Sequence, residues 1–246
     1  MYKYTKIETV FKRDVEGTKK LIEGEYRDKS IEYLKDNLWI GTEKIDGTNI
    51  GVVWDGYNVT FQGRTEKASI PPFLMKYLES TFKNSETEQI LEQLFGEKQV
   101  VLFGEGYGNK IQSGGKYCKD NKFILFDVYM PQADLWLERD SIEEIAKALG
   151  IDCVPIVFKG TIEEGVKFVK TKPKSTIGTA NMEGIVCKPA VDLLSRTNGI
   201  SIDINTLKKT IMSLKETKEL IEYINALFLD WQDAIIDIYL LGEHIF

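Results

Sequence analysis

Residues 50–61 restrict the fold more than any other part of the chain. Two short runs of β-branched and aromatic residues, 50–54 and 59–61, flank the dipeptide Asp55-Gly56. Asp-Gly accepts the positive backbone angles that a tight turn between antiparallel strands needs. The pattern predicts a β-hairpin, and it places Lys44 just after a strand and before that hairpin.

Further strands and helices are predicted along the chain without a regular alternation of one with the other. Runs of β-forming residues occur at 99–103, 123–129, 154–158 and 182–188. Apolar residues at helical spacing occur at 73–82, 86–95, 140–149 and 162–169. This mixture predicts an α+β fold in which antiparallel sheets are flanked by helices. Helical spacing after about residue 199 predicts a short helical tail over 200–246.

Composition limits the chemistry and the cellular setting. With one histidine, His244, a Ser/His/Asp site or a multi-histidine metal cage is hard to build, so chemistry must use lysine and carboxylates. Cys118, Cys153 and Cys187 lack the paired spacing of a zinc site or a disulfide framework, which favours a reducing compartment. No leader and no bilayer-length apolar run is found, so we expect a cytoplasmic protein without membrane contact. The formal net charge is -6, so any contact with a polynucleotide must be local.

The segment EKIDGTN, residues 43–49, contains a candidate nucleophile. Lys44 and Asp46 project to the same face of an extended backbone, and Gly47 then lets the chain turn. A lysine attacks phosphorus only as the neutral amine, and at an ordinary pKa of about 10.4 very little of it is neutral at pH 7. For this short motif alone, an exposed salt bridge beside a turn is the simpler interpretation.

Four further segments follow in a definite order: GRT at 63–65, FGEGYG at 103–108, FILFDVY at 123–129 and EGIVCKP at 183–189. With KIDGTN, they resemble the covalent nucleotidyltransferase superfamily of ATP-dependent RNA ligases, DNA ligases and mRNA capping enzymes. Within it the chain is similar to the RNA ligase 2 type, over roughly residues 1–198. The resemblance implies a nucleotidyltransferase (ATP-grasp-like) fold, with an adenylyltransferase domain over 1–199 and a helical appendage over 200–246.

The resemblance also implies roles for single residues. Lys44 matches the lysine that bonds to AMP, and Asp46 and Gly47 belong to the same nucleotide-binding motif. Glu43 matches a residue beside the adenine, and Phe126 matches the aromatic residue that stacks on it. Asn49 and Arg64 match polar residues near the ribose and phosphate, and Glu105 matches the carboxylate that binds a ribose hydroxyl. Lys188 matches a lysine that neutralises the triphosphate. Glu183 matches a carboxylate tied to the metal ion or its water shell.

Each of these residues also has a simpler interpretation. Arg64 could form a structural salt bridge, and the glycines beside Glu105 could form a plain turn. Phe126 could be an ordinary core residue of a strand. Glu183 and Lys188 could be surface charges on a strand.

The reaction implied by the resemblance has three steps at phosphorus. Lys44 displaces pyrophosphate from ATP with the help of Mg²⁺ or Mn²⁺, and AMP then passes to the 5′-phosphate of an RNA end. A 3′-hydroxyl finally attacks that activated phosphate and releases AMP. The expected partner is RNA with 5′-phosphate and 3′-hydroxyl ends, in a nicked duplex.

The sequence departs from the family pattern near its C-terminus. A strand ending in a K-x-K pair is expected some twenty residues after the EG-x-V segment, but ISIDINTLKKTIM follows residue 199 instead. Lys208 and Lys209 could serve in a shifted register, catalysis could be weakened or lost, or a coding change could have replaced the true C-terminus. The sequence leaves all three open.

Two other functions compete with an RNA ligase. The first is a non-catalytic module that binds ATP or RNA ends without transferring AMP. The second is a polynucleotide ligase that acts on DNA or hybrid nicks, or a capping enzyme. The roughly 47 residues after Gly199 leave little room for the oligonucleotide-binding domain that those relatives usually carry.

Overall fold

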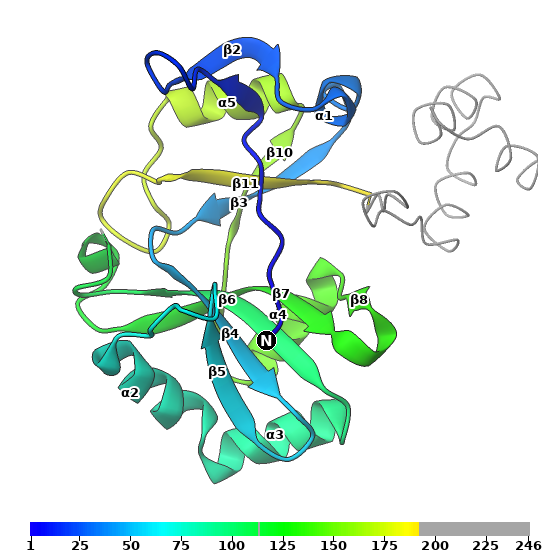
Figure 1. The fold of residues 1–246 in the computed structure, drawn as a ribbon, viewed down its shortest axis with the longest axis vertical. Coiled ribbons are helices and arrows are strands. Elements are labelled where there is room, and N and C mark those ends of the chain that lie inside the picture. Colours follow the sequence, from blue (N-terminus) through cyan, green and yellow to red (C-terminus); the bar gives the residue numbers. More distant parts are fainter. Residues whose placement is uncertain (113, 192–246) are drawn as a thin grey trace, which may run out of the picture. The chain divides into compact units, whose positions relative to one another are not determined.

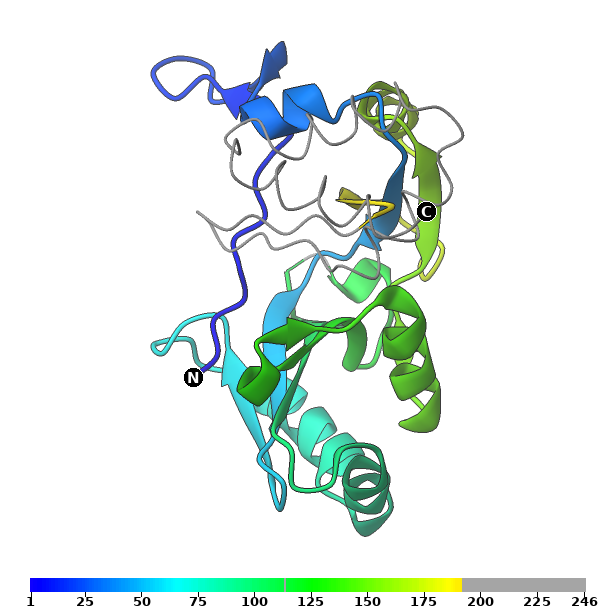
Figure 2. The same ribbon diagram turned by 90° about the vertical axis from the view of Figure 1, so that its right-hand side faces the viewer.

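The computed structural model describes residues 1–112 and 114–191, which fall into two compact units (Figures 1 and 2). The first unit comprises Met1–Ile7, Gly41–Lys159 and Gly165–Val186. The second comprises Glu8–Ile40, Gly160–Glu164 and residues 187–191. The predicted boundary at residue 199, the helical tail and the pair Lys208 and Lys209 lie outside the described residues.

A six-stranded sheet forms the centre of the first unit. The strand order is β5-β4-β6-β7-β8, with β9 pairing in parallel with β7 and every other pair antiparallel. Strands β4 and β5 form the predicted hairpin, in which Trp54 pairs with Val59. The bounds are β4 Thr48–Trp54, β5 Val59–Gly63, β6 Val100–Tyr107, β7 Lys122–Met130, β8 Leu135–Trp136 and β9 Asp152–Cys153.

Helices α2, α3 and α4 cover one face of this sheet. They span Pro72–Phe82, Ser85–Phe95 and Arg139–Ala148. Figures 1 and 2 show α2 and α3, in teal, against the blue and green strands. Their apolar stripes pack on alternate residues of β4, β6 and β7 in the main core, which includes Leu78, Leu91, Ile145, Val52 and Leu102. Alternation along each strand therefore sends the intervening residues, among them Asn49 and Glu105, to the opposite face.

A second sheet has three strands in the order β10-β3-β11. The bounds are β3 Trp39–Lys44, β10 Ile156–Gly160 and β11 Gly184–Pro189. A separate pair, β1 Phe11–Arg13 and β2 Leu21–Tyr26, lies in the second unit with α1 Lys29–Tyr33. Helix α5 spans Ile162–Lys170, and the short 3₁₀ turns η1 and η2 span Gly114–Lys116 and Pro131–Ala133. None of the described helices is long and apolar enough to cross a membrane.

The α+β class with antiparallel sheets is confirmed, and so are the predicted hairpin and the helices predicted at 73–82, 86–95, 140–149 and 162–169. Three differences stand out. Lys44 is the last residue of β3 rather than the residue after a strand. Strand β6 continues through the glycine-rich segment to Tyr107, so the alternative of a plain turn around Glu105 is wrong. The pair β1 and β2 and the helix α1 had no counterpart in the sequence prediction.

Candidate functional site

Lys44 stands at the exposed end of β3, where its Nζ contacts Glu183 Oε1. Glu183 directly precedes β11, the neighbour of β3 in the three-stranded sheet. The two side chains are 47% and 40% exposed, so the ion pair is solvated and contributes about 0–1 kcal/mol. A ligand that competes for either partner can therefore separate them at little cost.

Glu43 is buried beside this nucleophile, with 1% of its surface exposed. Its Oε2 accepts hydrogen bonds from the backbone N–H of Thr176 at 2.9 Å and from the Thr176 hydroxyl at 2.6 Å. Its Oε1 is buried and has no hydrogen-bond partner among the described residues. A buried carboxylate oxygen without a donor is costly, so this atom suits a ligand that brings an N–H or O–H group.

The segment after Lys44 packs closely on β6. Gly47 lies so near that strand that a Cβ there would come within 2.4 Å of the Gly106 carbonyl oxygen and 2.9 Å of Glu105 Cγ. One residue pair further along, Asn49 on β4 faces Glu105 on β6 directly. The K-x-D-G motif and the GEGYG segment are thus parts of one surface, held together by a position that admits only glycine.

The glycines on either side of Glu105 make room for side chains of the hydrophobic core and do not face the candidate site. A Cβ at Gly104 would meet Phe123 at 2.2 Å, and one at Gly106 would meet Leu74 at 2.6 Å. Both neighbours belong to the core under the helices. The glycines therefore allow that core to pack against β6, while Glu105 projects to the other face.

Burial strongly changes the acidity of the Glu105 carboxyl group. Burial raises its pKa from an ordinary 4.5 to about 8, with Glu183 and Asp46 adding to the rise and Lys44 and Arg64 opposing it. The group is therefore largely protonated at neutral pH, and it can donate a hydrogen bond as well as accept one.

Glu105→Gln is expected to change the unfolding free energy more favourably at pH 8 than at pH 5, each time relative to the wild type at the same pH. Between pH 4.5 and about 8 the folded protein keeps a proton that the unfolded chain has lost, so the unfolding free energy of the wild type falls as pH rises. Glutamine does not titrate. The difference in Tm between variant and wild type should therefore grow by several degrees from pH 5 to pH 8. A difference that is constant across this window, or equal to that of the exposed control Glu144→Gln, would contradict the assignment.

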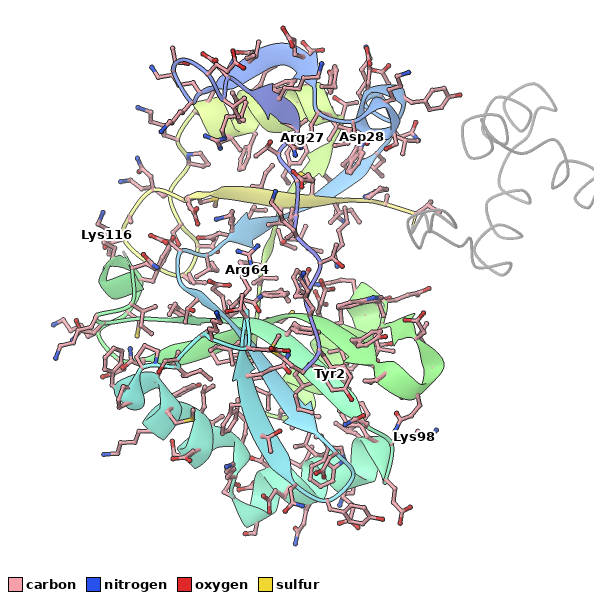
Figure 3. The ribbon with its side chains drawn as sticks, in the orientation of Figure 1. Tyr2, Arg27, Asp28, Arg64, Lys98 and Lys116 are labelled. Carbon is pink, nitrogen blue, oxygen red and sulfur yellow. The ribbon has the colours of Figure 1, made fainter. Side chains whose placement is uncertain are left out.

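Arg64 and Phe126 complete the predicted set around Lys44. Arg64, which Figure 3 labels, directly follows β5. It is close enough to Glu105 to lower the pKa of that carboxyl. Phe126 is the extra residue of a β-bulge, because Phe103 pairs with Asp127 whereas Gly104 pairs with Leu125. The bulge turns Phe126 away from the helix-covered core and against the small cluster that contains Ile45.

Two residues of this surface escaped the sequence prediction. Thr176 holds Glu43, as described above. The hydroxyl of Tyr117 accepts a hydrogen bond from the Asp46 N–H at 3.4 Å, and its ring packs edge-on against Tyr107 with centroids 6.1 Å apart. Burial raises the pKa of the Tyr117 hydroxyl, which therefore stays protonated at neutral pH. Neither residue lies in a recognisable motif, and no sequence signal would have found them.

The carboxylates near Lys44 suit a divalent cation only in part. Glu183 is exposed, and both Glu183 and Asp46 are close enough to Glu105 for their charges to raise the pKa of that carboxyl. Among the described residues, however, no three acidic, histidine or cysteine side chains form a ready metal site. This arrangement fits Mg²⁺, which is commonly held by one or two carboxylates together with substrate phosphates and water.

The structure thus brings together Glu43, Lys44, Asp46, Gly47, Asn49, Arg64, Glu105 and Glu183, with Phe126 on the same face of the sheet. Lys188 lies in the part of β11 that belongs to the second unit, and its role stays a prediction.

The chain is similar to known RNA ligases in sequence and in fold. Residues 37–210 match the model of the RNA ligase family, a span that also includes Lys208 and Lys209. Several solved structures of an RNA ligase from Naegleria gruberi have the same fold. One, a variant with ATP and manganese, has 22% identity and a TM-score of 0.53 over 65% of this chain and 48% of its own. Another, with pyrophosphate, has 21% identity and a TM-score of 0.53 over 75% and 55%. The chain spans about half the length of these proteins.

Proposed function

The chain belongs to the RNA ligase family, and from this premise we propose that it carries AMP on Lys44 while joining RNA ends. One observation carries the proposal: the lysine that ends β3 shares a surface with Glu105, Asp46, Arg64 and Glu183. An exposed amine among groups that bind sugar, phosphate and metal is what nucleotidyl transfer to lysine requires.

The nucleotide is ATP, and the buried side chains hold its adenosine. Glu43 Oε1, which has no protein donor among the described residues, accepts a hydrogen bond from the base. Phe126 stacks on the flat face of adenine. Glu105 bonds to a ribose hydroxyl, and in its protonated form it also donates to that oxygen.

The first reaction forms a bond between Lys44 Nζ and the α-phosphorus of ATP, and it breaks the bond from that phosphorus to pyrophosphate. Nζ must first leave the Glu183 carboxylate and release its proton to water. Arg64 donates to phosphate oxygens, and Lys188 neutralises the triphosphate. Glu183 binds Mg²⁺ or Mn²⁺, which neutralises charge on the phosphate oxygens when it is bound.

The later steps transfer AMP from Lys44 to the 5′-phosphate of an RNA strand and then join that strand to a 3′-hydroxyl in a nicked duplex. Both are displacements at phosphorus: the first breaks the bond to Lys44 Nζ, which takes up a proton as it leaves, and the second breaks the bond to AMP. They need a second substrate beside the lysine-bound nucleotide. Because the chain spans about half the length of the ligases it resembles, the full sealing reaction is part of the proposal.

Mass spectrometry of the intact protein tests the first step. After incubation with ATP and Mg²⁺, the denatured chain should gain the mass of one AMP, and added pyrophosphate should remove it by reversing the reaction. A chain that binds ATP without gaining this mass would instead be the non-catalytic relative. That outcome is favoured if the departure from the K-x-K pattern after residue 199 has removed a phosphate contact.

Sealing should depend on the sugar at the 3′ end of the nick. We expect faster joining when the 3′-hydroxyl belongs to a ribose than when it belongs to a deoxyribose, measured with otherwise identical nicked duplexes. The 2′-hydroxyl both donates and accepts hydrogen bonds, and it lets a protein distinguish RNA from DNA at one position. Equal rates on the two nicks would favour a general polynucleotide ligase.

A further inference from the structure

The segment that connects β6 to β7, residues 108–121, carries a local positive charge in an acidic protein. It contains three lysines, Lys110, Lys116 and Lys119, and one acidic residue, Asp120. All three lysines are exposed, and none has an ion-pair partner within residues 1–112 and 114–191. Unpaired surface cations can accept phosphate groups without first breaking a salt bridge.

The protein holds this segment next to Lys44. Tyr117, between two of the lysines, accepts the hydrogen bond from the Asp46 N–H, two residues after the nucleophile. The Lys116 carbonyl accepts hydrogen bonds from the Thr179 N–H at 3.2 Å and the Thr179 hydroxyl at 3.3 Å. A Cβ at Gly178 would come within 2.6 Å of the Tyr117 Cα, so the two backbones are in close contact. The lysines are thereby attached to the rim of the candidate site.

The Tyr117 hydroxyl also has an unused donor. Its oxygen accepts from Asp46, whereas no acceptor for its own proton is found among the described residues. Because burial raises its pKa, this proton is present at neutral pH. A phosphate oxygen placed between the lysines and Lys44 would be a suitable acceptor.

We propose that Lys110, Lys116 and Lys119 form a docking surface for the phosphate backbone of the RNA strand whose 5′-phosphate receives AMP. This inference rests on the proposed function, and it adds the place where the second substrate binds. RNA is the partner because the lysines border the surface of Lys44 and stand outside the buried residues that hold adenosine. In a protein of net charge -6, such a surface would steer a polyanion to one edge of the site.

The test compares two triple variants that change the net charge equally. The first replaces Lys110, Lys116 and Lys119 with alanine. The control replaces Lys76, Lys98 and Lys147, which are also exposed, belong to the same unit and have no ion-pair partner in the described chain. Lys76 and Lys147 are on α2 and α4, which cover the opposite face of the sheet, and Figure 3 shows Lys98 far from Lys116.

Binding of a 5′-phosphorylated RNA oligonucleotide is measured as a function of salt concentration. The slope of log K against log salt is negative, and each lost phosphate contact on a single strand reduces its magnitude by about 0.7, so in the first triple the magnitude should fall by about 2. Its affinity at 0.1 M salt should be on the order of 100-fold weaker, because each contact contributes about fivefold there. The control triple should bind within about threefold of the wild type, and Tm values should show that both variants are folded.

The results separate this proposal from the one on which it rests. Equal losses in the two triples, or no loss in the first, would overturn the docking surface even if the wild type gains AMP from ATP. If the first triple loses affinity selectively but the wild type gains no AMP, the three lysines bind RNA, and the function proposed for Lys44 is wrong.

Discussion

Lys44→Ala is expected to abolish the covalent attachment of AMP. The Nζ atom at the exposed end of β3 is the nucleophile of the proposed reaction, and an alanine leaves nothing to bond to phosphorus. With α-labelled ATP and Mg²⁺, label that survives denaturation should fall at least about a thousandfold below that of the wild type. Because the Lys44 side chain is exposed, the folding stability should change little.

Lys44→Arg is the matched variant for this experiment. Arginine keeps the charge and the long stem, and it can still contact Glu183, but its guanidinium does not lose its proton at neutral pH. It should therefore be as inactive as alanine while it preserves the ion pair. Labelled protein from either variant would mean that AMP is attached elsewhere, and the mechanism proposed for this surface would fail.

Glu183→Gln is expected to slow AMP attachment by about 100-fold or more. The carboxylate is the proposed holder of the divalent ion, and an amide is a much poorer ligand for a hard cation. Loss of one group that stabilises charge in the transition state commonly costs a factor of this size. The rate of adduct formation should be measured across Mg²⁺ concentrations, and the variant should need more Mg²⁺ to reach half its maximal rate.

Two observations would check that this effect arises at the site. Glu144→Gln, on the exposed surface of α4, removes the same charge and should leave the rate within about twofold of the wild type. Loss of the exposed contact between Glu183 and Lys44 should change the stability by less than about 1 kcal/mol. If Glu183→Gln retains the wild-type rate and Mg²⁺ requirement, Glu183 is not the metal ligand.

The elements that the sequence predicted well are those with a strong local pattern. The hairpin of β4 and β5 follows from alternating residues around Asp55-Gly56, and α2, α3 and α4 follow from apolar residues at helical spacing. The short strands β1 and β2 were not predicted. β1 has three residues, and nearly all of β2 is exposed, so neither shows a periodic apolar face.

The site could be predicted as a set of residues but not as an arrangement. The order of the five motifs identified Lys44, Glu105 and Glu183 together. The burial of Glu43 could not be predicted from any sequence pattern, and neither could its hydrogen bonds to Thr176, which is 133 residues further along the chain. The same is true of Tyr117, whose hydroxyl meets the backbone of Asp46 across 71 residues.

By itself, the sequence determined the strands and helices that have a strong local pattern and the residue types that recur in the family order, because periodicity and motifs are local properties of the chain. Only the tertiary structure decided that Gly47 must stay a glycine against Gly106, and that Glu105 becomes buried and changes its pKa. Those outcomes depend on atoms from strands far apart in the sequence. Close packing and the loss of water arise only when the sheet is assembled.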